Sequence, residues 1–227
     1  MPSTDMILIE RPRDAIALVT LNRPAKKNAL SIALRDELTG KLNHFAADET
    51  VKVVVLTGAG GAFSAGFDLD EFSRAVEEPN LYDRIWQSGD SFHKALLQFP
   101  LPLVAAVNGN ALGGGMDMAV LCDIRVASTT ARFGHPEARF GDVVYAPLHD
   151  LIGGAAAREL CLTGRIIDAH MAHSFGLVSA ITEPTDLIHN ALDIADEIAL
   201  TPRELLLRTK GKIISRASIP FTTTLEM

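Results

Sequence analysis

Two glycine-rich segments hold the residues whose types and spacing favour chemistry. Residues 58–69 read GAGGAFSAGFDL and residues 108–117 read NGNALGGGMD; each follows an apolar run of strand length and precedes a segment with helical character. A helix N-terminus leaves backbone N–H groups without partners inside the helix. Two such amides that point at one carbonyl oxygen stabilise an enolate or a tetrahedral oxyanion. The two segments therefore predict chemistry on a carbonyl compound.

Commoner glycine motifs do not fit these segments. A dinucleotide-binding GxGxxG motif that starts at Gly58 fails because its sixth position is Phe63. A phosphate-binding GxxxxGK[ST] loop that starts at Gly109 fails because Gly115 and Met116 replace the lysine and the hydroxyl residue. Neither nucleotide-binding interpretation is retained.

Ser64 leaves one alternative open, a serine hydrolase. Residues 62–66 read AFSAG, which lacks only the first glycine of the GxSxG motif around a hydrolase nucleophile. That glycine relieves crowding at a sharp turn, so its loss weakens the match. The candidate bases for such a nucleophile are His93, His135 and His149.

The surrounding pattern predicts an α/β protein. Apolar runs indicate strands at 6–10, 15–21, 51–56, 103–107 and 124–127. Helical spacing of apolar residues indicates helices at 31–47, 82–98, 116–122, 148–162, 168–175, 185–200 and 202–215. Strands that alternate with helices favour a sheet with helices packed outside it. The similar position of the two glycine segments, each after such a strand, indicates a repeated strand–turn–helix unit.

Composition narrows the class of protein. The 227 residues suit one large domain or a domain with a small appendage, and 48% hydrophobic with 22% charged residues is typical of a soluble globular protein. A net charge of −7 argues against a nucleic-acid surface. Cys122 and Cys161 lie in apolar surroundings, which favours buried free thiols in a reducing compartment. With neither a secretory signal nor a membrane span in the sequence, we expect a cytoplasmic protein that binds no membrane.

Five motifs in order resemble the enoyl-CoA hydratase/isomerase (crotonase) family. They are LNRPAKKNAL at 21–30, FSAGFDL at 63–69, VNGNALGGG at 107–115, FGHPE at 133–137, and LTGR at 162–165 followed by GLV at 176–178. The likeness extends from about residue 6 to 217. It implies a crotonase-like ββα spiral core with a CoA-thioester site over residues 1–184. Residues 185–227 would then form a helical C-terminal region, shorter than is usual for the family.

The resemblance also implies roles for individual residues. The N–H groups of Phe67 and Gly114 would form an oxyanion hole for the thioester carbonyl, and Glu137 would exchange a proton with the α-carbon. Asp117 stands where hydratases usually carry a second glutamate that positions water; from its place in the first turn of a helix it reads equally well as a cap. The expected CoA-binding residues are Ala25, Lys26, Ala65, Asp68 and Leu69.

The implied activity is reversible hydration of a 2-enoyl-CoA thioester, as in fatty acid metabolism. Two alternatives remain: an enoyl-CoA isomerase that uses Glu137 alone, with a structural Asp117, and a catalytically weak acyl-CoA-binding protein. No metal or redox cofactor is implied, because CoA arrives with the substrate, and a homotrimer or dimer of trimers is expected.

Two further departures from the family pattern leave the acyl group, the oligomer contacts and part of the CoA pocket open. After Glu137, residues 141–147 pass quickly into a helix where a proline- and glycine-rich loop is common. Tyr145 and His149 are candidates to enter the acyl pocket. The sequence also stops at residues 225–227, before the further helices that usually cover the site.

Overall fold

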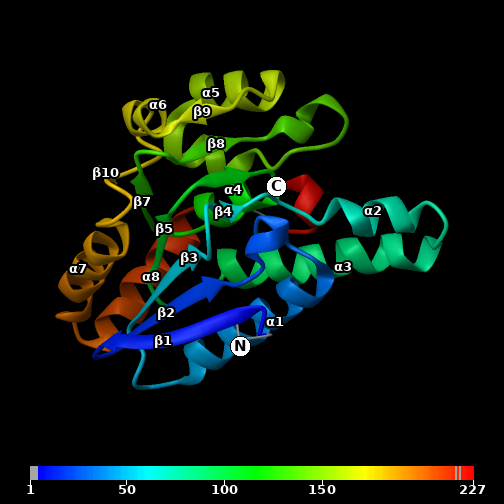
Figure 1. Ribbon diagram of the computed structural model, residues 1–227. Helices are drawn as coiled ribbons and strands as arrows, with labels where there is room; N and C mark the ends of the chain where they lie inside the picture. The colour runs from blue at the N-terminus through cyan, green and yellow to red at the C-terminus, as the bar shows by residue number, and fades with distance from the viewer. Residues whose placement is uncertain (1–4, 218, 220) are drawn as a thin grey trace.

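The computed structural model describes residues 5–217, 219 and 221–227. The larger of its two sheets has six strands. Their order is β1 (Ile7–Arg13), β2 (Ile16–Leu21), β3 (Val53–Gly58), β5 (Leu103–Val107), β7 (Ile124–Ser128) and β10 (Ala180–Thr182) (Figure 1). Strand β1 is antiparallel to β2, and the other neighbours are parallel. A smaller sheet has the order β4 (Ala62–Ser64), β6 (Asn110–Leu112), β8 (Arg132–Gly134) and β9 (Ile167–Asp168).

Helices cover both faces of the larger sheet. Side chains alternate along each strand, so that in β2 Ile16 and Leu18 pack with helix α7 (Leu187–Ala199), while Ala17 and Val19 pack in the core on the other face. That second core includes apolar residues of α1 (Ile32–Ala47) and α3 (Pro79–Leu97). Coverage of both faces explains why the strands read as continuous apolar runs.

The chain passes three times from the larger sheet to the smaller one. Strand β3 leads through β4 to α2 (Leu69–Ala75), β5 through β6 to α4 (Gly114–Val120), and β7 through β8 to the 3-10 helix η2 (Pro136–Arg139). Strands β4, β6 and β8 are parallel neighbours, with Ser64 beside Ala111 and Leu112 beside Gly134. Their ends therefore lie together at one edge. The repeated unit predicted from the glycine segments is confirmed, and this edge carries the candidate site.

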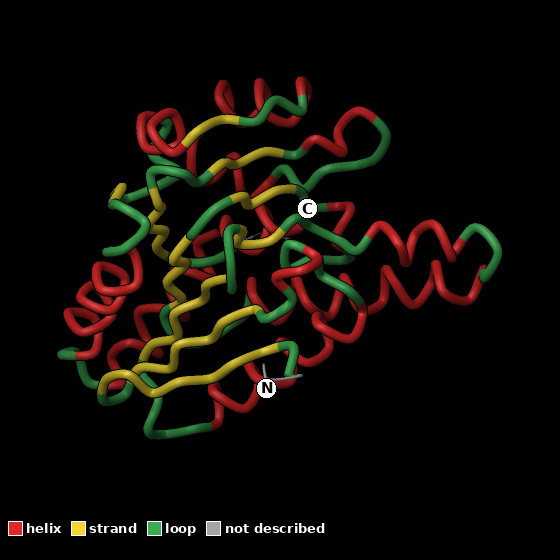
Figure 2. The backbone as a smooth tube through the Cα atoms, viewed as in Figure 1, coloured by secondary structure: helices red, strands yellow, loops and turns green. Residues whose placement is uncertain are grey.

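The remaining elements surround this frame (Figure 2). They are η1 (Pro24–Lys26), α5 (Ala146–Thr163), α6 (Ala169–Ser174), α8 (Arg203–Ala217) and η3 (Thr224–Glu226). Segment η3 packs against α3, and the carbonyl of Met227 accepts hydrogen bonds from the N–H groups of Tyr145 (3.2 Å) and Ala146 (2.5 Å). Helix α2 and the first turns of α3 project from the body as an arm (Figure 1).

Most predicted elements are confirmed, with bounds shifted by a few residues and strand 103–107 reproduced as expected. Helix α2, the four strands of the smaller sheet and β10 were not predicted. The predicted helix 82–98 begins earlier, at Pro79, because proline is favoured in the first turn of a helix. Cys122 and Cys161 are buried free thiols, as expected. Within the described residues no helix is long and apolar enough to cross a membrane.

Candidate active site

The two glycine turns contact each other through their backbones. Gly66 has a φ of +90°, and a Cβ on it would lie 2.7 Å from the carbonyl oxygen of Leu112 and 3.2 Å from the nitrogen of Gly114. Only glycine combines this conformation with so close an approach. The ring of Phe67 lies over Gly114, since a Cβ there would be 2.7 Å from its Cδ1. The two residues predicted to donate oxyanion hydrogen bonds are therefore neighbours.

The first of these turns is held by the segment LNRPAKKNAL at residues 21–30. The N–H of Leu30 donates to the carbonyl of Gly66 (2.8 Å), and the N–H of Ala65 donates to that of Lys27 (3.0 Å). This pairing brings the η1 region close to the first turn. Four of the five residues expected to bind CoA are exposed, as a ligand surface requires: Ala25, Lys26, Ala65 and Leu69.

Asp68 differs from the other four residues. Its buried carboxylate forms an ion pair with Arg23 at 3.0 Å and accepts a hydrogen bond from the N–H of Asp70 (3.2 Å), which caps helix α2. Lys26 is engaged too, because its exposed ammonium lies 2.7 Å from the carboxylate of Asp70. The carboxylate of Asp68 thus holds the turn in place.

Glu137 extends from η2 to the start of the second glycine turn. A Cβ on Gly113 would lie 3.1 and 3.2 Å from the two carboxylate oxygens of Glu137, so this carboxylate rests against the residue that precedes Gly114. Burial raises the pKa of Glu137; His135 opposes the rise and Asp117 adds to it. The site therefore favours the protonated acid more than water does.

Asp117 lies in the first turn of α4 and pairs with a buried histidine. The N-cap residue of helix α4 is Gly113, and Asp117 is the acidic residue of its first turn. Asp117 Oδ1 lies 2.7 Å from Nε2 of His135, the residue that follows β8. The Asp117 side chain is 8% exposed and that of His135 is 0% exposed.

The pair carries opposite charges. Burial disfavours a charged imidazole, but the Asp117 carboxylate outweighs burial and raises the pKa of His135 to about 10. His135 is consequently an imidazolium at neutral pH. It supplies the positive charge that an ionised Asp117 needs in a buried site.

The pH dependence of the protein's thermal stability should reveal the ion pair between Asp117 and His135. Because the pKa of His135 rises from 6.5 to about 10 on folding, its stabilising contribution is complete below about pH 6.5 and is lost as the pH rises through about 10. In His135→Gln a neutral amide donor replaces the imidazolium. We expect the difference in melting temperature between wild type and variant to shrink over this range; parallel curves would contradict the pairing.

A second buried histidine lies on the other side of Asp117. His93 Nε2, from α3, is 3.7 Å from Asp117 Oδ2, and the His93 ring stacks on Phe67 with centroids 5.9 Å apart. The guanidinium of Arg35 lies 4.1 Å from the centroid of the Phe67 ring. Burial lowers the pKa of Arg35 to about 10, which leaves it charged at neutral pH. Phe67 is thus fixed by contacts with two other elements.

Ser64 has no catalytic dyad in the structure. Its buried hydroxyl donates to the carbonyl of Asn28 (2.9 Å) and accepts from the N–H of Gly66 (3.2 Å). In the described part of the chain no histidine is hydrogen-bonded to it, so the geometry does not favour a serine hydrolase. Tyr145 and His149, the acyl-pocket candidates, pack on each other with ring centroids 5.5 Å apart, and His149 is exposed.

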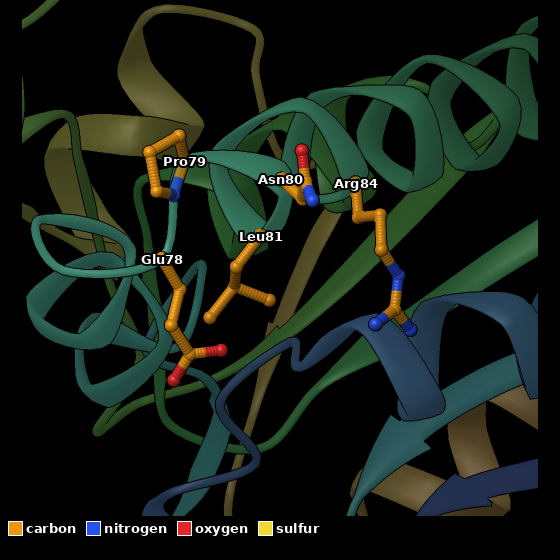
Figure 3. Close-up of a pocket in the computed structure, with 5 residues that line it drawn as sticks. All are labelled: Glu78, Pro79, Asn80, Leu81 and Arg84. Atoms are coloured by element: carbon orange, nitrogen blue, oxygen red, sulfur yellow. The ribbon is translucent and has the colours of Figure 1, made fainter.

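A surface cavity of about 280 Å³ lies at the start of α3, away from these groups (Figure 3). Its lining residues are Glu78, Pro79, Asn80, Leu81 and Arg84. None of them is a predicted site residue. Over the described ranges, no group of three histidine, cysteine, aspartate or glutamate side chains is arranged to hold a metal ion.

Comparison with known proteins identifies the family. The sequence model of the enoyl-CoA hydratase/isomerase family matches residues 11–225. The chain belongs to this family. A putative enoyl-CoA hydratase of Thermus thermophilus is 36% identical over 92% of this chain and 84% of its own. The enoyl-CoA hydratase of Bacillus anthracis superimposes with a TM-score of 0.90 at 32% identity, over 95% of this chain and 85% of its own.

Family membership confirms the resemblance and the expected fold, but the named activities differ among similar proteins. A structure described as a monofunctional enoyl-CoA isomerase from M. smegmatis has a TM-score of 0.82 and 32% identity, over 95% of each chain. The enoyl-CoA hydratase/isomerase fold therefore accommodates both reactions, and the side chains of the site must distinguish them.

Proposed function

We propose that this enoyl-CoA hydratase/isomerase family member catalyses the reversible addition of water to a 2-enoyl-CoA thioester. The observation that carries the proposal is a pair of carboxylates in contrasting environments beside the two glycine turns. Asp117 is paired with an imidazolium, whereas burial raises the pKa of Glu137. Hydration needs one ionised carboxylate as base and one protonated carboxyl as acid, and environments that differ in this way assign the two roles.

The glycine turns would hold the thioester. The N–H groups of Phe67 and Gly114 donate to its carbonyl oxygen and withdraw electrons from the conjugated double bond, which activates the β-carbon. Negative charge then accumulates on this oxygen as an enolate forms. Loss of one such donor typically costs roughly 3–4 kcal/mol of transition-state stabilisation.

The two carboxyl groups would move the protons. Asp117 takes a proton from water as the water oxygen forms a bond to the β-carbon, and the π electrons of the double bond move onto the thioester oxygen. Glu137 then gives its proton to the α-carbon as the enolate collapses. The product is a 3-hydroxyacyl-CoA, and proton exchange with solvent restores both carboxyl groups.

An enoyl-CoA isomerase is the second candidate. The observation in its favour is that His135 already occupies one oxygen of Asp117, as it would if this pair were purely structural. Glu137 alone would then move a proton from the α-carbon to the γ-carbon. This reaction uses the same two amides and consumes no water.

The test is the product formed in deuterated water from a short trans-2-enoyl-CoA and a 3-enoyl-CoA, read by mass spectrometry. We expect the 2-enoyl thioester to gain one molecule of water with deuterium at the α-carbon. Double-bond migration without water addition would establish the isomerase instead. If both thioesters bind unchanged and take up no deuterium, the chain is an acyl-CoA-binding protein without turnover.

The proposal extends to the setting of the reaction. CoA enters as part of the substrate, and the steps above require no metal or redox cofactor. The two free cysteines support a reducing compartment such as the cytoplasm, and the family supports a role in acyl-CoA metabolism. The family resemblance supports a homotrimer or a dimer of trimers, which light scattering on the purified protein would resolve.

A further inference from the structure

His93 has a buried ring nitrogen without a partner. Its side chain is 0% exposed, and Nδ1 lies 3.0 Å from the hydroxyl oxygen of Thr224 in η3. Among the residues that the structure describes, Nε2 has no hydrogen-bond partner. Buried polar atoms are almost always hydrogen-bonded, to protein or to ordered water. His93 Nε2 therefore keeps an unused hydrogen-bonding capacity, and its position beside Asp117 is what distinguishes it from the other unpartnered atoms of the described residues, Thr39 Oγ1, Trp86 Nε1 and His135 Nδ1.

The nitrogen faces the free oxygen of the proposed base. His135 engages Asp117 Oδ1, which leaves Oδ2 3.7 Å from His93 Nε2. That separation is too long for a direct hydrogen bond, yet one water molecule at about 2.8 Å from each atom can bridge them. The stacking of Phe67 on His93 places this pair next to the first proposed oxyanion donor.

We propose that His93 is a further catalytic residue of this site, and that its Nε2 together with Asp117 Oδ2 binds the water that adds to the substrate. The inference rests on the proposed hydration. The water donates one hydrogen to each atom, which turns an oxygen lone pair toward the β-carbon. As the carbon–oxygen bond forms, the O–H bond to Asp117 breaks and its proton passes to that carboxylate. His93 keeps its own protonation state throughout.

This role requires a neutral His93 with its lone pair on Nε2. The tautomer with a proton on Nδ1, donated to the Thr224 hydroxyl, provides it. Burial lowers the pKa of His93; Asp117 of α4 and Asp90 of α3 oppose the decrease, and the Arg35 guanidinium of α1 reinforces it. A neutral imidazole at physiological pH therefore suits the surrounding charges.

The test compares water addition with proton exchange in His93 variants. In His93→Phe the ring can still stack on Phe67 but cannot bind water, so we expect kcat for hydration to fall on the order of 10²-fold. KM for the 2-enoyl-CoA should change little. Exchange of the α-protons of a 3-enoyl-CoA in deuterated water should persist, because it needs only Glu137 and the two amides. His93→Gln should recover part of the hydration rate.

The control is Leu96→Ala, which shortens another buried side chain of α3 and leaves both members of the polar pair in place. Hydration by His93→Phe at the rate of this control would overturn the proposal. A parallel loss of hydration and exchange in a folded variant would overturn it too, because it indicates a packing role. Wild-type protein that exchanges α-protons but adds no water would instead refute the proposed hydration, and this inference with it.

Discussion

Glu137→Gln should reduce hydration by about 10²- to 10⁴-fold, the usual contribution of a positioned acid or base. Glutamine fills the same volume against Gly113 but has no acidic proton to give to the α-carbon. Both proposed reactions need this proton transfer, so isomerisation and α-proton exchange should fall with hydration. The measurement is kcat for each reaction, together with calorimetric titration of a saturated acyl-CoA.

The affinity of the Glu137→Gln variant for an acyl-CoA distinguishes a chemical role of Glu137 from a structural one. The amides proposed to hold the carbonyl are untouched by the substitution, so the dissociation constant for the acyl-CoA should stay within a few-fold of wild type. Glu49→Gln, an exposed carboxylate far from the site in sequence, is the matched control and should behave as wild type. Full activity in Glu137→Gln would rule out the mechanism under either reaction.

Asp117→Asn should slow hydration but not isomerisation, and it should destabilise the fold. The amide cannot accept a proton from water, which predicts a loss of about 10²- to 10⁴-fold in hydration, while isomerisation by Glu137 is spared. It also leaves the imidazolium of His135 without its counter-charge at 2.7 Å, and breaking a buried pair on one side costs roughly 3–5 kcal/mol. Denaturant unfolding and both activities should be measured on the same preparation.

The double variant Asp117→Asn/His135→Gln identifies the source of each effect. Removing both charges should restore much of the lost stability, because neutral amides can hydrogen-bond to each other. Hydration should not return, since no base has been restored. Additive losses in stability would show that the two residues are not coupled. Unchanged hydration in Asp117→Asn would show that Asp117 is structural and is not the base.

The sequence was informative where one short segment determines the local geometry. The two glycine turns follow strands, and local spacing alone was enough to predict the turns, whereas the family resemblance singled out Phe67 and Gly114 within them. The strands of the larger sheet were predicted because both of their faces are apolar. Strands β4, β6 and β8 escaped prediction because three residues are too few to show an alternating pattern.

The sequence did not predict which charged and polar side chains of the site contact one another. Asp117 and His135 are 18 residues apart, and their contact depends on the register between β6 and β8. His93 was considered only as a base for Ser64, because nothing in its helix indicates which side chain it faces. Arg35 is buried next to Leu34, but Asp36 and Glu37 follow it directly, so the sequence did not distinguish this buried arginine from its charged neighbours.

Each chemical part of this site sits on its own turn, at the end of its own short strand. The first turn carries Phe67, the second Gly114 and Asp117, and the third His135 and Glu137, while backbone pairing among β4, β6 and β8 fixes their relative positions. Side chains that avoid the close glycine contacts between the turns can therefore be exchanged without moving the strands that carry them. Replacement of the proposed base together with its counter-charge would leave the two proposed carbonyl-binding amides in place, so such a scaffold can diversify from one reaction to another.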